Sequence, residues 1–175
     1  MAQLVLTVVG DDRAGLVNAL AQAVSGAGGN WEQSELAELA GAFAGIVLVT
    51  VPDDRVDELT GALQSLDGLL RVTVHGGVGS TLAGDEAGSE RPDTLSFTVL
   101  GNDRPGIVRD VTTAIAAHAL SIDAFRSRTL EAPMAGGTLF EASVSVSVPR
   151  GVDAEAITAA LEALAGEIQV DLTVG

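Results

Sequence analysis

One motif occurs twice in this chain, and the duplication limits the possible folds more than any other feature. The segment LVLTVVGDDRAGLV begins at Leu4, and LSFTVLGNDRPGIV begins at Leu95. Matching residues recur at a constant offset of 91 positions, as in Gly10 and Gly101. In each copy, β-forming residues precede a glycine and an amphipathic helical pattern follows it. We call residues 10–16 the first corner and residues 101–107 the second corner, and we predict that each joins a strand to a helix.

The pattern after each corner predicts the same order of elements in both halves. In the first half we expect strands over 4–9, 30–39, 43–51 and 69–74, a turn at Ala40 and Gly41, and helices near residues 16 and 53. Asp53 is a plausible N-cap of the second helix. In the second half we expect strands over 95–100, 121–130, 139–148 and 168–174, and helices from about Pro105 and Asp153. Six extra residues are expected in the second hairpin, around 132–137.

The predicted order is βαββαβ in each half, which is typical of a ferredoxin-like fold. The fold class is therefore α+β, with two such domains in tandem, each a four-stranded antiparallel sheet with two helices on one face. Strand 139–148 alternates apolar and polar residues, as expected when one sheet face packs on helices. Strand 4–9 is apolar on both sides, so we expect the open face to pack on the twin domain or on another chain.

A change in composition separates the two halves. Residues 77–92 are rich in glycine, serine and charge and have no apolar period. We therefore predict a first domain over 1–76, a flexible linker over 77–92 and a second domain over 93–175. Each half is near the lower size limit for independent folding.

Composition excludes several functional classes. The chain has no cysteine and two histidines, so we expect no metal site and no cofactor, and the reducing cytoplasm fits best. The formal net charge of −15, from 24 acidic and nine basic residues, repels nucleic acid and anionic lipid. The first apolar run is too short to span a bilayer, and no secretory signal precedes it. We therefore expect no direct binding to nucleic acid or membrane.

The corners are the candidate binding sites because a helix start leaves backbone N–H groups without partners. The N–H groups of Gly15 and Leu16, or of Gly106 and Ile107, could bind a carboxylate. A glycine there lets a ligand approach the backbone closely. Pro105 at the helix start would make the second corner more rigid.

The polar residues of the corners have two interpretations each. Asp12 and Asp103 could act as N-caps or could hold the ammonium group of a ligand. Arg13 and Arg104 are more typical of surface ion pairs than of ligand contacts. Asn30 and Ser121 begin the strand that follows the first helix, and we expect them near the corner, where they orient a ligand or stabilise a turn.

With these residues in view, the chain resembles tandem ACT-domain proteins, and among them the glycine cleavage system transcriptional repressor group. The resemblance rests on GDDRAGLV followed by GGNWEQSELAELAGAFAGIVLV, and on GNDRPGIV followed by SIDAFRSRTL. It covers residues 2–75 and 95–174.

The resemblance implies a regulatory domain that binds a small amino acid, of the glycine or serine class, where two domains meet. It also implies a homodimer and a DNA-binding protein partner. In serine-binding relatives the positions of Asp12, Asp103, Asn30 and Ser121 are often Asn. Only Asn30 keeps that residue here, so the resemblance implies that the first site is better preserved. The implied ligand-binding positions are Asp12, Arg13, Ala14, Gly15, Leu16, Asn30, Asp103, Arg104, Pro105, Gly106, Ile107 and Ser121.

Two other functional classes remain open. Acylphosphatases share the fold order, but neither corner places a nucleophile beside a base, and His75 and His118 lie in unlike contexts. A ligand-free interaction module is the other alternative, because fold alone does not define function. The amino-acid sensor is the preferred interpretation.

Overall fold

The computed structural model describes residues 1–76, 93–132, 136–148, 154–163 and 168–174. The chain divides into two compact units, Met1–Ala87 and Gly88–Gly175, which are described separately. The linker prediction for residues 77–92 lies outside the described residues.

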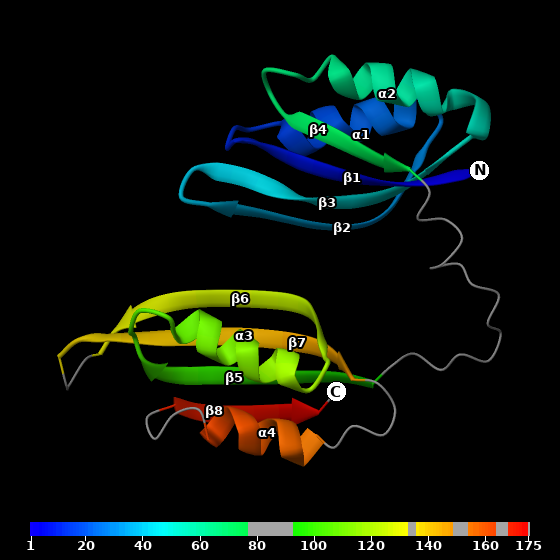
Figure 1. Cartoon of the computed structure of the whole chain (residues 1–175). Helices are drawn as coiled ribbons and strands as arrows, with labels where there is room; N and C mark the ends of the chain where they lie inside the picture. Colours follow the sequence, from blue (N-terminus) through cyan, green and yellow to red (C-terminus); the bar gives the residue numbers. More distant parts are fainter. Residues whose placement is uncertain (77–92, 133–135, 149–153, 164–167, 175) are drawn as a thin grey trace. The chain divides into compact units, whose positions relative to one another are not determined.

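The first unit contains four strands and two α-helices in the predicted order (Figure 1). Helices α1 and α2 cover one face of the sheet. A short 3-10 turn, η1, precedes α2. The elements are β1 (Ala2–Asp11), α1 (Leu16–Gly26), β2 (Asn30–Leu39), β3 (Ala42–Val51), η1 (Asp53–Arg55), α2 (Val56–Gln64) and β4 (Arg71–Gly76).

The second unit repeats this order, with α3 and α4 against one face of its sheet. Its elements are β5 (Asp93–Asn102), α3 (Ile107–Ala117), β6 (Ser121–Glu131), β7 (Thr138–Val148), α4 (Ala154–Ala163) and β8 (Ile168–Val174). The α+β, ferredoxin-like prediction is therefore confirmed for both units.

Each sheet is antiparallel, and its first strand lies in the interior. The strand orders are β2-β3-β1-β4 and β6-β7-β5-β8. Alternate residues of β1, such as Leu6, face the helices and pack against Leu20 of α1 and Leu59 of α2, all three with no exposed surface. Residues of β7 alternate in the same way, with Val144 and Val146 buried, as predicted. Burial of this face fixes the register of each strand.

Glycine determines the sharp turns of the first unit. Ala40 and Gly41 have φ values of 52° and 82°, so both central residues of the β2–β3 hairpin are left-handed, as a two-residue turn requires. At the end of α1, Gly28 has a φ of 70° and donates its N–H to Ser25 O, while Gly29 donates to Val24 O. This pair of bonds is the Schellman arrangement that ends a helix.

Some predicted boundaries in the first unit were wrong. Asp53 does not cap α2, because η1 intervenes and its carboxylate lies 2.7 Å from the ammonium of Met1. That contact lowers the pKa of Asp53. Strand β4 begins at Arg71 rather than at Leu69, and the two residues before it belong to a loop.

The extra residues of the second hairpin lie between β6 and β7, as predicted. Ala132 N donates to Gly137 O across this loop, and residues 133–135 lie outside the described part of the chain. On the open face of the first sheet, Val9 and Ile46 are 46% and 50% exposed. Packing of that face on a partner stays a prediction.

Candidate functional site

Both corners place a left-handed glycine immediately before the helix. Gly15 has φ 92° and ψ 0°, and Gly106 has φ 85° and ψ 0°. Each is the N-cap residue, and neither helix has a side-chain capping hydrogen bond. The N-cap predictions for Asp12 and Asp103 were therefore wrong, because the backbone turn puts glycine at the cap position.

Both glycines are required for their left-handed conformation, and at Gly15 this is the sole requirement. A Cβ on Gly15 would meet nothing within 4 Å, so space was not the constraint there. A residue with a side chain is strained at a φ near +90°. Pro105 does not start α3, which begins two residues later at Ile107.

The carboxylates and N–H groups of the corners differ in what they contact. Asp12 and Asp103 are exposed, and their backbone N–H groups donate to Gly41 O and Thr138 O, each at 2.8 Å. These bonds tie the first corner to the turn of the β2–β3 hairpin and the second corner to the first residue of β7. Within the described residues, neither carboxylate makes a hydrogen bond or ion pair.

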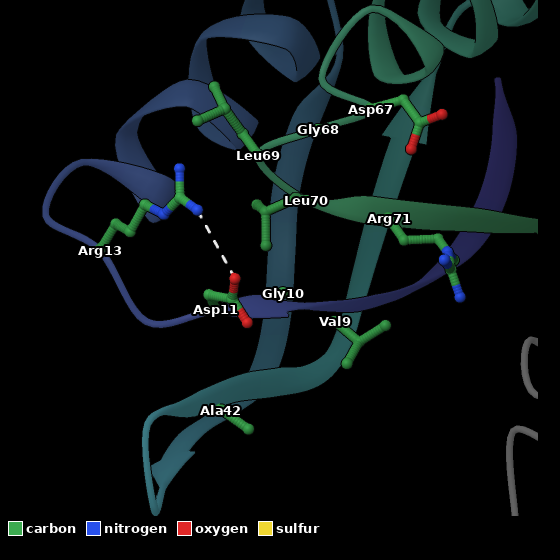
Figure 2. A pocket seen from close by; sticks show the side chains of 10 residues that line it. All are labelled: Val9, Gly10, Asp11, Arg13, Ala42, Asp67, Gly68, Leu69, Leu70 and Arg71. Carbon is green, nitrogen blue, oxygen red and sulfur yellow. Dashed lines mark ion pairs between the residues drawn. The ribbon is translucent and has the colours of Figure 1, made fainter.

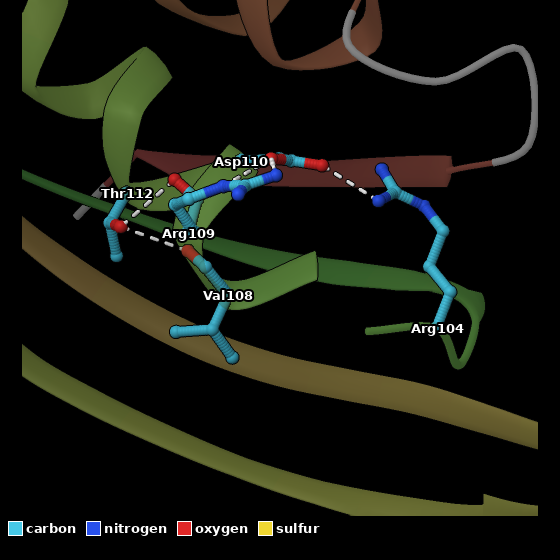
Figure 3. Close-up of polar contacts among 5 residues, drawn as sticks. All are labelled: Arg104, Val108, Arg109, Asp110 and Thr112. Carbon is cyan, nitrogen blue, oxygen red and sulfur yellow. Dashed lines mark hydrogen bonds and ion pairs between the residues drawn. The ribbon is translucent and has the colours of Figure 1, made fainter. Parts of the chain in front are cut away.

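An ion cluster covers the start of α3 at the second corner. Asp110 accepts hydrogen bonds from Arg104 Nη1 at 2.7 Å and from Arg109 Nη2 at 3.1 Å (Figure 3). These arginines, Arg104 first, lower the pKa of the Asp110 carboxyl. The Arg109 guanidinium also lies 3.1 Å from the position of a Cβ on Gly106. Ile107 N donates to Arg104 O, so that N–H is already used.

The first corner has no such cluster. The positions of Arg109 and Asp110 are occupied by Asn18 and Ala19 at the same offset. Of the residues that the structure describes, Arg13 pairs with Asp11 alone, at 3.5 Å, and both side chains are more than half exposed. Among the described residues, Leu16 N donates no hydrogen bond equivalent to the one from Ile107 N to Arg104 O. The first helix start is therefore the more accessible of the two.

A cavity of about 430 Å³ lies beside the first corner (Figure 2). It is bounded by the end of β1, the start of β3, the loop between α2 and β4, and the first residue of β4. The lining residues are Val9, Gly10, Asp11, Arg13, Ala42, Asp67, Gly68, Leu69, Leu70 and Arg71. The corresponding loop of the second unit, residues 164–167, lies outside the described residues.

Only one predicted site residue, Arg13, lines this cavity. Sequence reasoning missed Asp67, Leu69 and Arg71, since they belong to no motif. Their proximity to the corner follows from the pairing of β4 with β1, in which Val9 lies opposite Arg71. Gly10 allows this approach, because a Cβ there would lie 2.6 Å from Leu69 O.

Asn30 lies at the opposite end of the sheet from the first corner, so its predicted position was wrong. Asn30 pairs with Thr50, whose other neighbour is Gln3, near the start of β1. Eight residue steps separate Gln3 from Asp11, roughly 26 Å along an extended strand. Helix α1 runs back along the sheet, so the next strand starts where β1 started.

The start of β2 has its own polar contacts. Glu32 Oε1 accepts hydrogen bonds from Asn30 Nδ2 at 2.9 Å and from Thr50 Oγ1 at 2.8 Å. These bonds, that of Asn30 first, lower the pKa of Glu32. Ser121 has the equivalent position in the second unit and pairs with Ser147, also far from its corner.

The described part of the chain has no group of three His, Asp or Glu side chains that could hold a metal ion. Thr7 Oγ1 lies 3.2 Å from His75 Nε2, on β1 and β4 rather than at a corner. No helix among the described residues has the length and apolar character needed to cross a membrane.

Comparison with protein families identifies the two units. A family model described as ACT domain matches residues 2–76, and another with the same description matches residues 96–166. The chain belongs to the ACT-domain family. The resemblance inferred from the paired corners is confirmed, and the units are two ACT domains in tandem.

Two solved structures match nearly the whole length of this tandem ACT-domain chain. An unknown protein from Galdieria sulphuraria is 28% identical, with a TM-score of 0.84, over 99% of this chain and 98% of that one. A candidate glycine cleavage system transcriptional repressor is 18% identical, with a TM-score of 0.70 and the same coverage. At that identity the second likeness shows the fold alone. No curated protein matches the chain.

Proposed function

We propose that this chain is a non-catalytic regulatory protein that binds one small α-amino acid at its first corner. The observation that carries the proposal is the difference between the corners. At the second, the carboxylate of Asp110 already lies at the helix start, where it pairs with both Arg104 and Arg109. At the first, the helix start is uncovered and a cavity lies beside it.

The first corner offers groups of both charges to an amino acid. Backbone N–H groups at the start of α1, with the helix dipole, favour a carboxylate. The exposed carboxylate of Asp12 favours an ammonium group. Asn30 is remote from its own corner, so it could join this site only from another copy of the domain. A homodimer would supply such a copy.

Regulation would follow from a ligand that favours one assembly over another. A ligand shifts an equilibrium only through its different affinities for the two states. The net charge of −15 repels DNA, so we expect a protein partner to recognise the ligand-bound assembly. The similarity in fold to a candidate glycine cleavage system transcriptional repressor supports a role in glycine or one-carbon metabolism. We also propose the cytoplasm as its location.

A thermal-shift panel of amino acids tests this function. The protein is first unfolded and refolded to remove retained ligand, and mass spectrometry checks that it is empty. A ligand at one hundred times its Kd adds about 2.7 kcal/mol to the free energy of unfolding, which raises Tm measurably. We expect such a shift with at least one amino acid. No shift with any of the twenty would contradict the proposed function.

A further inference from the structure

The cavity beside the first corner combines charged groups with exposed apolar surface. Asp11 and Arg13 come from the corner, and Asp67 and Arg71 come from the α2–β4 loop and β4 (Figure 2). Leu69 and Val9 belong to the same lining and are 47% and 46% exposed. Binding cavities characteristically join apolar surface to a few polar groups that orient the ligand.

The charges of this lining favour a ligand that carries both signs. Arg13 and Arg71 are two of only nine basic residues in the chain, and each has an aspartate in the same lining. Arg13 is weakly engaged by Asp11 at 3.5 Å, whereas Arg71 and Asp67 have no partner among the described residues. A simple anion or cation would meet repulsion from one pair of these groups. A zwitterion can pair its carboxylate with arginine and its ammonium with aspartate.

The apolar part of the lining favours one kind of ligand side chain over others. Glycine would leave Leu69 and Val9 in water, and the hydroxyl of serine gains nothing from contact with them. An aliphatic side chain would remove both from solvent, which is favourable in proportion to the apolar area buried. The volume of about 430 Å³ falls within the range typical of small-molecule sites, about 300–1,000 Å³.

We infer that this cavity selects an α-amino acid with an aliphatic side chain, such as valine or leucine, over glycine and serine. The inference rests on the proposed function, because it assumes that the first corner binds an amino acid. Leu69 and Val9 contact the side chain, and Arg71 supplements the backbone N–H groups at the start of α1 in binding the carboxylate. In the second domain the register position of Arg71 is held by Gln169, which pairs with Leu100 as Arg71 pairs with Val9.

Isothermal titration of the full chain with glycine, serine, valine and leucine tests the inference. 4-Methylpentanoate, which is leucine without its ammonium group, and isoamylamine, which is leucine without its carboxylate, test the need for both charges. We expect valine or leucine to bind at least tenfold more tightly than glycine, and both single-charge compounds to bind at least tenfold more weakly than leucine. Tighter binding of glycine or serine than of leucine, or binding of 4-methylpentanoate as tight as that of leucine, would overturn the inference.

Variants assign the selectivity to named residues. We expect Leu69→Ala to bring the leucine-to-glycine affinity ratio toward one, and Arg71→Gln to weaken leucine binding at least tenfold. The controls are Leu39→Ala, at an 80% exposed position on the hairpin, and Arg128→Gln, which removes a pair with Glu141. The controls should bind leucine within twofold of the unmodified chain, and circular dichroism verifies that each variant is folded.

Two further outcomes have separate meanings. An unchanged affinity ratio in Leu69→Ala, while the unmodified chain binds amino acids, would overturn the selectivity and leave the proposed function intact. Failure of every amino acid to bind the unmodified chain would overturn the proposed function, and this inference with it.

Discussion

Nη1 of Arg104 lies 2.7 Å from Oδ2 of Asp110, whereas the position of Asp110 in the first domain is occupied by Ala19. Two corners with nearly the same sequence motif therefore differ in surface chemistry. The second domain holds its own anion at the helix start, in the first turn of α3, where the helix dipole also stabilises a carboxylate. The first domain has no acidic side chain in the first turn of α1.

The pKa of Asp110 should lie below its ordinary value of 3.8, because Arg104 and Arg109 stabilise the ionised form. The contribution of this carboxylate to stability is present above the unfolded pKa and is lost as pH falls through the folded pKa, below 3.8. A carboxyl-detected NMR titration measures the value directly. In Arg104→Ala the midpoint should rise toward 3.8, and an unchanged midpoint would show that this arginine has no influence.

Replacing Gly15 with alanine should destabilise the chain by about 1–2 kcal/mol, the cost of a left-handed conformation for an L-residue. The matched control is Gly61→Ala in α2, where φ is ordinary and a Cβ would meet nothing within 4 Å. That control should stabilise by about 0.5–1 kcal/mol, because alanine is the better helix former. Urea unfolding followed by circular dichroism measures both. Equal effects from the two substitutions would refute the conformational explanation.

Replacing Gly10 with alanine should push the α2–β4 loop away from β1, because the new Cβ would lie 2.6 Å from Leu69 O. Overpacking of this kind costs about 1–3 kcal/mol. Hydrogen exchange of the amides of residues 68–71 should become faster than in the unmodified chain. Gly26→Ala, with open space around its Cβ position, serves as the control. Unchanged exchange in Gly10→Ala would argue against the close approach.

Local patterns in the sequence predicted most of the fold. The alternation in β7, the helical period of α1 and the turn at Ala40 and Gly41 each depend on a few neighbouring residues. Repetition of the same order in the second half supported the βαββαβ topology. The start of α1 at Leu16 was also predicted, but α2 and α3 begin later than expected, because η1 precedes α2 and a left-handed Gly106 takes the cap position of α3.

The candidate site depends on contacts between residues distant in the chain, which no local pattern reveals. Asn30 was expected near the corner, but the return path of α1 places it at the far end of the sheet. Asp67 and Arg71 reach the first corner only through the pairing of β4 with β1. The ion cluster at the second corner could not be predicted without the three-dimensional positions of Arg104 and Asp110, which lie on different segments.

The number of amino acids bound per chain tests the central claim, that only the first corner is a site. Native mass spectrometry of ligand-free full chain, supplied with glycine, serine, valine or leucine in turn, counts them. We expect one ligand per chain, with reduced occupancy in Arg71→Gln, whose side chain lines the cavity, and unchanged occupancy in Asp103→Ala. Two ligands per chain, or equal loss in both variants, would contradict it.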